Sequence, residues 1–338
     1  MKKSVVLICA TIIVVALVIG LALTSFAQKK DDGPSGLLGE GMTVYIQCGG
    51  PEGGPATIAR TNGARDAAKH LGVKLIEQYS KWQPEIMIQQ FQEAIAAEPD
   101  GIAIMGHPGS DAFAPFVDEA EAKGIVITSG NTPLTPLYMK YVGNGFGYAG
   151  VDLYLGGYVT GLNMIRGGLK RGDKALVYGL MAEAERGMST RGMFDALSEN
   201  GLDVDYLEIS PEVNADFSLC VPVLTAYLSR NPDVKGIGTQ HGGITSMFEK
   251  VLSESGKKPG DVVAGGIDLT PQTIDGLKSG YVSATLDQQL YLQGFLPVLQ
   301  IVLTKKYGFA GMYINTGAWV VTPATIDKLV PLIDAGIR

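Results

Sequence analysis

Short apolar runs alternate with longer amphipathic segments along most of the chain. Each run is a few residues long and is bounded by glycine or polar residues, which predicts buried strands rather than helices. The intervening segments have helical periodicity; over 84–97, for example, Ile88, Phe91 and Ile95 fall on one face. This alternation is typical of βα units and predicts a parallel sheet. The first four strands are predicted at 42–47, 73–78, 101–106 and 124–130.

A glycine-bearing crossing at 141–147 separates this series from a second one. A long helix from about Tyr148 to Ile165 is expected to open the second series. The strands of this series are predicted at 173–179, 203–209, 234–240, 261–267 and 281–287. Two such series predict two lobes rather than one large sheet. The helix over 291–306 is expected to return to the first lobe, and 318–326 predicts a strand followed by a capped helix.

The beginning of the sequence has the pattern of a targeting segment. Two lysines precede a long apolar run, and the small residues Ser25 and Ala27 occupy the positions before a cleavage site. We therefore predict a signal peptide over 1–27. An uncleaved membrane anchor over residues 4–23 is the alternative, because the apolar run approaches the length that spans a bilayer. The polar stretch 28–41 is expected to be a flexible tether, and the body is expected in the periplasm or at the cell exterior.

Charge and cysteine content narrow the possible functions. The net charge of the 338 residues is −7, and it is −9 without the first 27 residues. No run of lysine or arginine exceeds two residues, so a nucleic-acid partner has no electrostatic support. A leader stands where a DNA-binding regulator would carry a helix-turn-helix. Cys48 and Cys220 fall in different predicted lobes and are expected to be free thiols.

The stretch 265–293 carries the strongest chemical signal. Asp268 follows one predicted strand, and Gln288 follows the next. Ligands of open parallel α/β sheets bind outside the carboxyl ends of the strands. A carboxylate accepts hydrogen bonds from neighbouring hydroxyls, while an amide both donates and accepts, so the pair suits a polyhydroxylated molecule. The structural alternative is a helix-capping Asp268 and a solvated Gln288.

Other strand exits carry side chains of the same kind. A sugar needs paired donors and acceptors for its hydroxyls and aromatic rings for its C–H faces. Arg186 is also expected to pair with Asp268 when the site is empty. The structural alternatives are that His107 is an ordinary loop residue, that Trp82 packs over a helix, and that Phe217 belongs to the core. The candidate ligand-binding residues are Asp268, Gln288, His241, Phe217, Arg186, Asn131, His107 and Trp82.

Catalytic and metal motifs are absent from the sequence. Neither H-E-x-x-H nor G-x-S-x-G nor C-x-x-C occurs, and the three histidines are scattered. His241-Gly-Gly is similar to a hydrolase oxyanion loop, but no nucleophile elbow accompanies it. We therefore predict no catalytic residues, no metal and no cofactor. An exported sugar hydrolase remains a rival interpretation.

Three segments carry a resemblance to a known family: EPDGIAIMGHPGSDAF, NPDVKGIGTQHG and the stretch from Asp268 to Gln288. With them, residues 42–308 resemble the periplasmic sugar-binding proteins of ABC importers, in the ribose-binding-like branch. The resemblance implies the α/β fold of type I periplasmic binding proteins, with two Rossmann-like lobes and parallel sheets joined by a three-crossing hinge. The implied N-terminal lobe is 42–143 plus 289–310, and the implied C-terminal lobe is 144–288 plus 311–338.

The resemblance also assigns roles to residues of the second lobe. Gln288 matches the hinge-side glutamine of the family, Asp268 its hydroxyl-binding aspartate and Phe217 its cleft phenylalanine. His241 stands where the ribose binder has asparagine, and Arg186 lies near the arginine of the family.

Two departures fall in the first lobe. Ala56-Thr57 replaces a pair of aromatic residues, and Gly130-Asn131 replaces an Asp-Arg pair. The first lobe is therefore expected to hold its ligand through Trp82, His107 and Asn131.

The implied function is capture of a monosaccharide and its delivery to the membrane permease of an ABC importer. The membrane would be contacted only through the leader or the permease. The alternative is a sensor of the same fold that feeds a chemoreceptor or a sensor kinase.

Overall fold

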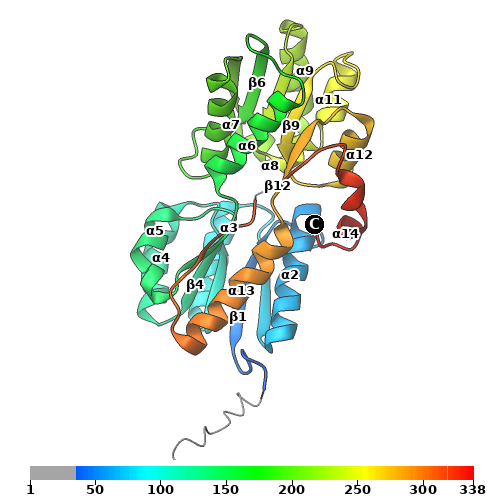
Figure 1. Ribbon diagram of the computed structural model, residues 1–338. Coiled ribbons are helices and arrows are strands. Elements are labelled where there is room, and N and C mark those ends of the chain that lie inside the picture. The colour runs from blue at the N-terminus through cyan, green and yellow to red at the C-terminus, as the bar shows by residue number, and fades with distance from the viewer. Residues whose placement is uncertain (1–35, 318) are drawn as a thin grey trace, which may run out of the picture. The chain divides into compact units, whose positions relative to one another are not determined.

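The computed structural model describes residues 36–317 and 319–338. The predicted signal peptide or anchor at 1–27 and most of the predicted tether lie outside the described residues. From Leu38 to Arg338 the chain forms one compact unit that contains two six-stranded sheets (Figure 1). Within the described residues, no helix combines the length and the apolar character needed to cross a membrane.

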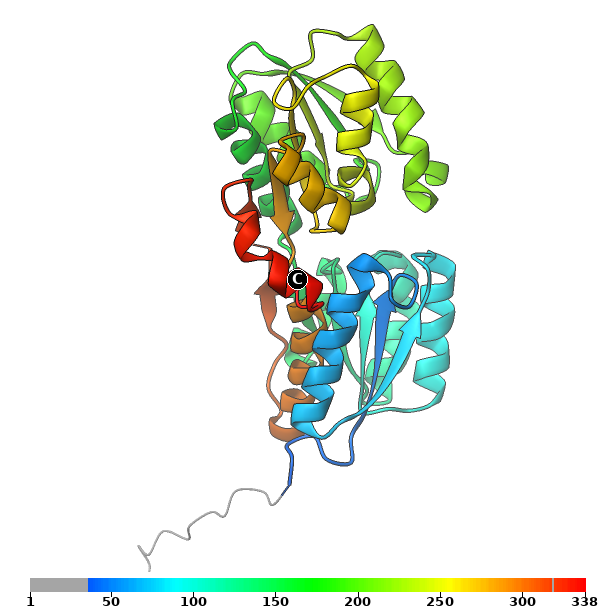
Figure 2. The same ribbon diagram turned by 90° about the vertical axis from the view of Figure 1, so that its right-hand side faces the viewer.

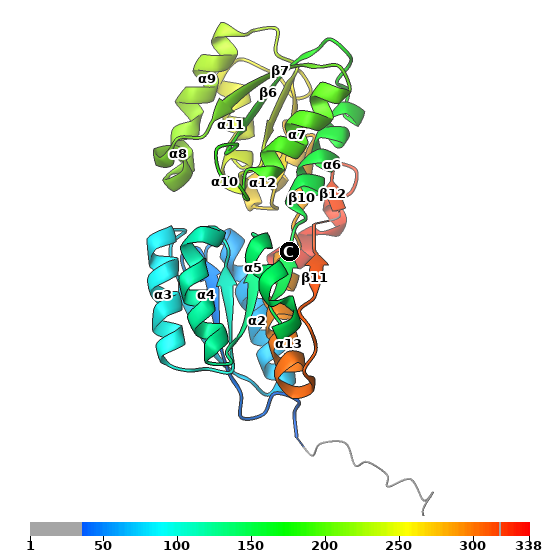
Figure 3. The same cartoon turned by 90° about the vertical axis from the view of Figure 1, so that its left-hand side faces the viewer.

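The first sheet is parallel throughout and has the order β11-β5-β4-β3-β1-β2. Its strands are β1 (Thr43–Gly49), β2 (Lys74–Tyr79), β3 (Gly101–Met105), β4 (Val126–Gly130), β5 (Gly147–Gly150) and β11 (Tyr313–Asn315). One face packs against α2 (Pro55–Leu71) and α13 (Leu290–Tyr307). The other face packs against α3 (Pro84–Ala96), α4 (Ser110–Ala122) and α5 (Thr135–Tyr141) (Figure 3). Cover on both faces explains why β3 and β4 are buried along their whole length.

The second sheet has the order β12-β10-β9-β8-β6-β7 and is parallel except for β12. Its strands are β6 (Lys174–Gly179), β7 (Asp203–Glu208), β8 (Gly236–Thr239), β9 (Val263–Ile267), β10 (Ala284–Asp287) and β12 (Trp319–Val321). α6 (Leu153–Arg166) and α7 (Met188–Glu199) contribute to one hydrophobic cluster. α9 (Cys220–Arg230), α11 (Phe248–Glu254) and α12 (Pro271–Ser279) contribute to another. Short helices α8 (Pro211–Ala215), α10 (Gly242–Thr245) and α14 (Val330–Asp334) complete this lobe.

Each lobe contains one pair of helices in backbone contact. In the first lobe α2 and α13 lie side by side (blue and orange in Figure 2). A methyl group at Gly63 would overlap the carbonyl oxygen of Tyr291, and one at Gly294 would overlap that of Arg60. The second lobe repeats this arrangement between α6 and α7, with Gly157 and Gly192 as the contact residues. Only glycine permits so close an approach.

Sheet membership corrects the predicted lobe boundaries. Residues 147–150 and 313–315 were assigned to the second lobe, yet they form β5 and β11 of the first sheet. The helix expected from about Tyr148 begins at Leu153. The sequence GYAG is too short and too rich in glycine to give a strand pattern, which is why the crossing was placed too early.

The end of the predicted tether is packed rather than free. The amide of Gly39 donates to the carbonyl oxygen of Leu71 at 2.7 Å, and Leu38 packs against the core between α2 and α13. The strand predicted within 318–326 is present as β12. Cys48 and Cys220 are buried in different cores and are unpaired, so each behaves as a small apolar side chain.

Gly294→Ala is expected to lower the free energy of unfolding by about 1–3 kcal/mol, because the added methyl group forces α13 away from α2. Urea unfolding followed by circular dichroism measures this. Gly143→Ala is the matched control, since a methyl group at that exposed position meets no atom within 4 Å. Equal stability of the two variants would show that the close contact between α2 and α13 does not contribute to the free energy of unfolding.

Candidate functional site

The loops at the carboxyl ends of both sheets line one cavity of about 450 Å³. All eight candidate residues named from the sequence lie in its lining, although each of them follows a different strand. The topology explains this convergence, because the strand exits of both sheets meet at the same place. Whether these side chains contact a ligand stays a prediction.

Asp268 and Gln288 point toward each other in this cavity. Gln288 Nε2 donates to Asp268 Oδ1 at 2.7 Å. Asp268 follows β9 directly and has a left-handed backbone (φ 71°), which aspartate tolerates better than most residues. Its backbone is fixed by two hydrogen bonds, from its amide to the Leu286 carbonyl and from Thr285 Oγ1 to its own carbonyl.

A second left-handed residue, Asn131, presents its amide from the first sheet. It follows β4 directly, with φ 66°. Its Nδ2 lies 3.4 Å from Gln288 Oε1, and its Oδ1 accepts from His107 Nε2 at 2.7 Å. The ring of His107 stacks on Trp82 with centroids 5.6 Å apart. A continuous polar chain therefore runs from the first sheet through Asn131 to Gln288 and Asp268.

The two candidate aromatic residues cover glycines at the cavity wall. Trp82 lies over Gly49 and Gly50, where a methyl group would meet its indole ring. Phe217 lies over Gly243 in the same way and is 40% exposed. The core alternative for Phe217 is therefore wrong. Both aromatic residues also line the cavity, and an aromatic ring suits contact with the C–H face of a sugar.

Arg60 is the charged group that sequence reasoning missed. It is fully buried on α2, where Nη1 donates to the Cys48 carbonyl at 3.1 Å and Nη2 donates to Gln293 Oε1 at 3.0 Å. Burial lowers the pKa of Arg60 to about 10, so the group stays charged at neutral pH. The signal was available, because Arg60 falls on the same buried helical stripe as Ala64 and Ala67.

The predicted pairing of Arg186 with Asp268 is wrong. Arg186 Nη1 lies 3.6 Å from Glu183 Oε2 and donates to Asn214 Oδ1 at 3.4 Å. The cation whose charge acts on Asp268 is Arg60. Glu183, three residues earlier in the chain, lies close enough to pair with Arg186. The order of the strand ends along the sequence does not reveal this contact.

Burial sets the protonation states of the cavity. Desolvation raises the pKa of Asp268 to about 6, while the hydrogen bond from Gln288 and the charge of Arg60 hold it down. Desolvation and the charge of Arg186 lower the pKa of His241 to about 3, and the same causes place the pKa of His107 well below its usual value. At neutral pH the cavity therefore offers one carboxylate, two neutral imidazoles and fixed arginines.

Four residues of the cavity lining each carry a buried polar atom without a hydrogen-bond partner among the described residues. The atoms are Thr57 Oγ1, Arg60 Nε, Gln240 Nε2 and His241 Nδ1. A buried polar atom without a partner costs about 1–3 kcal/mol, and none of the four is itself exposed to the cavity. Thr57 and Asn214 were not named as candidates, and Gln240 was noted only as a neighbour of His241.

The contribution of Asp268 to the stability of the free protein is expected to fall as pH rises from about 4 to about 6, while the buried His107 and His241 act in the opposite direction. In that window folded Asp268 holds a proton that the unfolded chain, with a carboxyl pKa near 3.9, has released. Asp268→Asn should lack this contribution, so its stability relative to the natural chain should rise across the window by on the order of 1 kcal/mol. Urea unfolding at pH 4.5, 5.5, 6.5 and 7.5 measures the difference. A constant difference would contradict the assignment.

Comparison with known proteins agrees with this architecture. Residues 58–304 match the family described as periplasmic binding protein domain. The xylose/arabinose-binding protein XylF of Sulfolobus acidocaldarius is 31% identical over 257 residues, a match that covers 71% of this chain and 61% of the relative. This chain thus spans less than two thirds of that relative.

Solved structures show the same fold at lower identity. A solute-binding protein of Agrobacterium vitis bound to α-D-tagatopyranose is 20% identical, with a TM-score of 0.75 over 88% of this chain and 99% of the other. A carbohydrate transporter protein of Acidothermus cellulolyticus in complex with myo-inositol is also 20% identical, with a TM-score of 0.72 and the same coverage. With the family match extending over most of the chain, the protein belongs to the periplasmic binding protein domain family.

Proposed function

We propose that this protein captures a monosaccharide in the cavity between its two sheets and delivers it to the membrane permease of an ABC importer. The Asp268–Gln288 pair carries the proposal, because a carboxylate beside an amide can accept from two hydroxyls of a sugar and donate to a third. The names of the similar proteins, among them a xylose/arabinose-binding protein, support the same ligand class.

The site supports binding rather than turnover. Glycoside hydrolysis uses two carboxyl groups on opposite sides of the scissile bond. Among the described lining residues Asp268 is the sole carboxylate. The described residues also contain no cluster of three or more His, Cys, Asp or Glu that could hold a metal ion. We therefore infer a solute-binding role for the body, exported by the leader or tethered by residues 4–23.

Binding from both lobes provides the mechanism. Trp82, His107 and Asn131 belong to the first lobe, whereas Asp268 and His241 belong to the second. A sugar held by both sets stabilises the arrangement in which both reach it, and so shifts the population toward that arrangement. A micromolar dissociation constant requires about 8 kcal/mol, which a few charged hydrogen bonds and a ring contact supply.

Asp268→Ala is expected to abolish the rise in melting temperature that a monosaccharide produces. Loss of two hydrogen bonds to a carboxylate, at about 1.5 kcal/mol or more each, lowers affinity at least about a hundredfold. A thermal-shift screen across aldopentoses, aldohexoses and polyols measures this. Asp275→Ala is the matched control, since Asp275 is exposed on α12 and outside the cavity lining. Undiminished sugar-dependent melting of Asp268→Ala would refute its role.

Sugar binding is expected to change tryptophan fluorescence through Trp82. The chain has two tryptophans, and Trp319 is not among the residues that line the cavity. Trp82→Phe should therefore lose most of the sugar-dependent signal while calorimetry still detects binding, because phenylalanine keeps an aromatic face. A full signal in Trp82→Phe would place the sugar away from this ring.

A further inference from the structure

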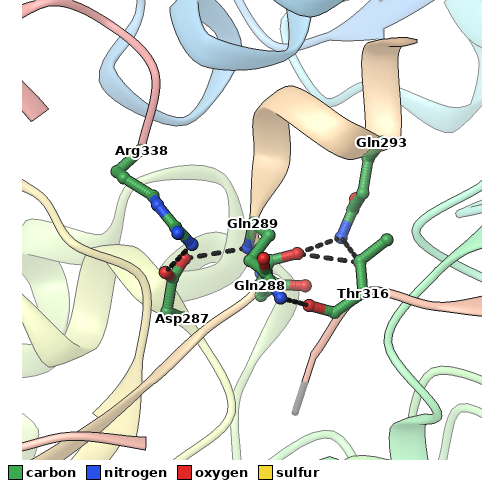
Figure 4. Close-up of polar contacts among 6 residues, drawn as sticks. All are labelled: Asp287, Gln288, Gln289, Gln293, Thr316 and Arg338. Atoms are coloured by element: carbon green, nitrogen blue, oxygen red, sulfur yellow. Dashed lines mark hydrogen bonds and ion pairs between the residues drawn. The ribbon is translucent and has the colours of Figure 1, made fainter. Parts of the chain in front are cut away.

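A buried ion pair forms at Asp287, the last residue of β10, which immediately precedes Gln288. Arg338 Nη1 contacts Asp287 Oδ2 at 2.6 Å, and the other carboxylate oxygen of Asp287 accepts from the Gln289 amide at 2.8 Å (Figure 4). The Asp287 side chain is only 4% exposed. None of these residues lines the cavity except Gln288, which stands between Asp287 and Gln289.

Two further contacts fix Arg338 and the residues that precede it. Trp319 is the β12 partner of Asp287 in the antiparallel ladder, and the Arg338 guanidinium lies over its ring, 5.9 Å from the centroid. Two residues before Arg338, the carbonyl of Gly336 accepts from Asn62 Nδ2 of α2 at 3.1 Å. A guanidinium fixed by an aromatic face and a carboxylate is a specific contact rather than a surface ion pair.

Thr316 and Gln293 fix the backbone around Gln288. Its carbonyl accepts from Thr316 Oγ1 at 2.8 Å and from Gln293 Nε2 at 3.1 Å. Gln289 has a left-handed backbone (φ 52°), and its Nε2 donates to the Thr316 carbonyl at 2.6 Å (Figure 4). With both neighbours of Gln288 anchored, its side chain is directed to Asp268.

Asp287 also acts on Asp268 through its charge. The two carboxylates follow one another at the ends of adjacent strands, β9 and β10, and the negative charge of Asp287 raises the pKa of Asp268. Arg338 is the cation paired with Asp287, while Arg60 is the cation whose charge acts on Asp268 from α2. The remaining titratable groups of the lining are Lys81, His107, Arg186 and His241, of which both imidazoles are neutral at pH 7.

We propose that Arg338 is a positioning residue of the sugar site, which neutralises Asp287 and thereby keeps Asp268 ionised and Gln288 directed toward it. The proposal rests on the function proposed above, but its electrostatic part concerns Asp268 alone and holds with or without a sugar. It predicts that the two halves of the ion pair act on Asp268 in opposite directions, which a purely structural contact would not do.

The test compares Arg338→Gln, Arg338→Lys and Asp287→Asn in the full chain. ¹³C NMR of aspartate carboxyl groups, with Asp268→Asn to assign the resonance, follows the titration of Asp268 directly. Arg338→Gln should raise the pKa of Asp268 by about 0.5–1 unit and Asp287→Asn should lower it by a similar amount. Arg338→Lys should stay near the natural chain, because it keeps the charge. The double variant Asp287→Asn/Arg338→Gln should return close to the natural value.

The binding measurement separates this proposal from the proposed function. Affinity for D-xylose and L-arabinose is measured by calorimetric titration between pH 4.5 and 8. The pH below which the affinity falls should be higher in Arg338→Gln and lower in Asp287→Asn than in the natural chain. No binding by the natural chain would count against the sugar function, while the NMR result still decides the role of Arg338. Equal or same-direction shifts of Asp268 in the two single variants would overturn the proposal.

Discussion

The hydrogen bond from Gln288 to Asp268 is the contact on which the site depends. It brings a carboxylate and an amide from adjacent strands of one sheet to the point where side chains of the other sheet also arrive. The carboxylate is costly to bury, and Gln288 and Arg60 reduce that cost without neutralising it through a direct ion pair. A partly compensated acceptor of this kind gains more from ligand hydroxyls than a fully paired one would.

Gln288 also belongs to the crossing between the lobes. Its side chain faces the cavity, while its carbonyl oxygen is bound by Thr316 on another crossing segment and by Gln293 of α13. Gln293 in turn accepts from Arg60 at the cavity wall. The cavity lining and the crossing between the lobes therefore share one residue and its immediate partners. A displacement of Gln288 at the cavity therefore acts directly on the crossing segments.

The sequence predicted local features well and distant partners poorly. Asp268, Asn131 and Gln288 were found because each directly follows a strand, which is a short-range signal. Arg60 was missed although it lies on the buried stripe of α2, because its contact with Gln293 depends on how α2 packs against α13. Arg186 was given a distant partner, whereas the acid beside it, Glu183, is three residues away in the chain. The pair of Asp287 and Arg338 is 51 residues apart in the chain and has no periodic signature. The short strands β5 and β11 were missed because tertiary pairing rather than local propensity makes them strands.

The glycine contacts between helices have a mechanical consequence. Backbone touches backbone at Gly63 and Gly294 and again at Gly157 and Gly192, so no side chain separates the helices at these points. Sliding of one helix along the other is therefore restricted at these contacts. If the two lobes change their separation around a bound molecule, the change falls in the few linking residues rather than inside either lobe.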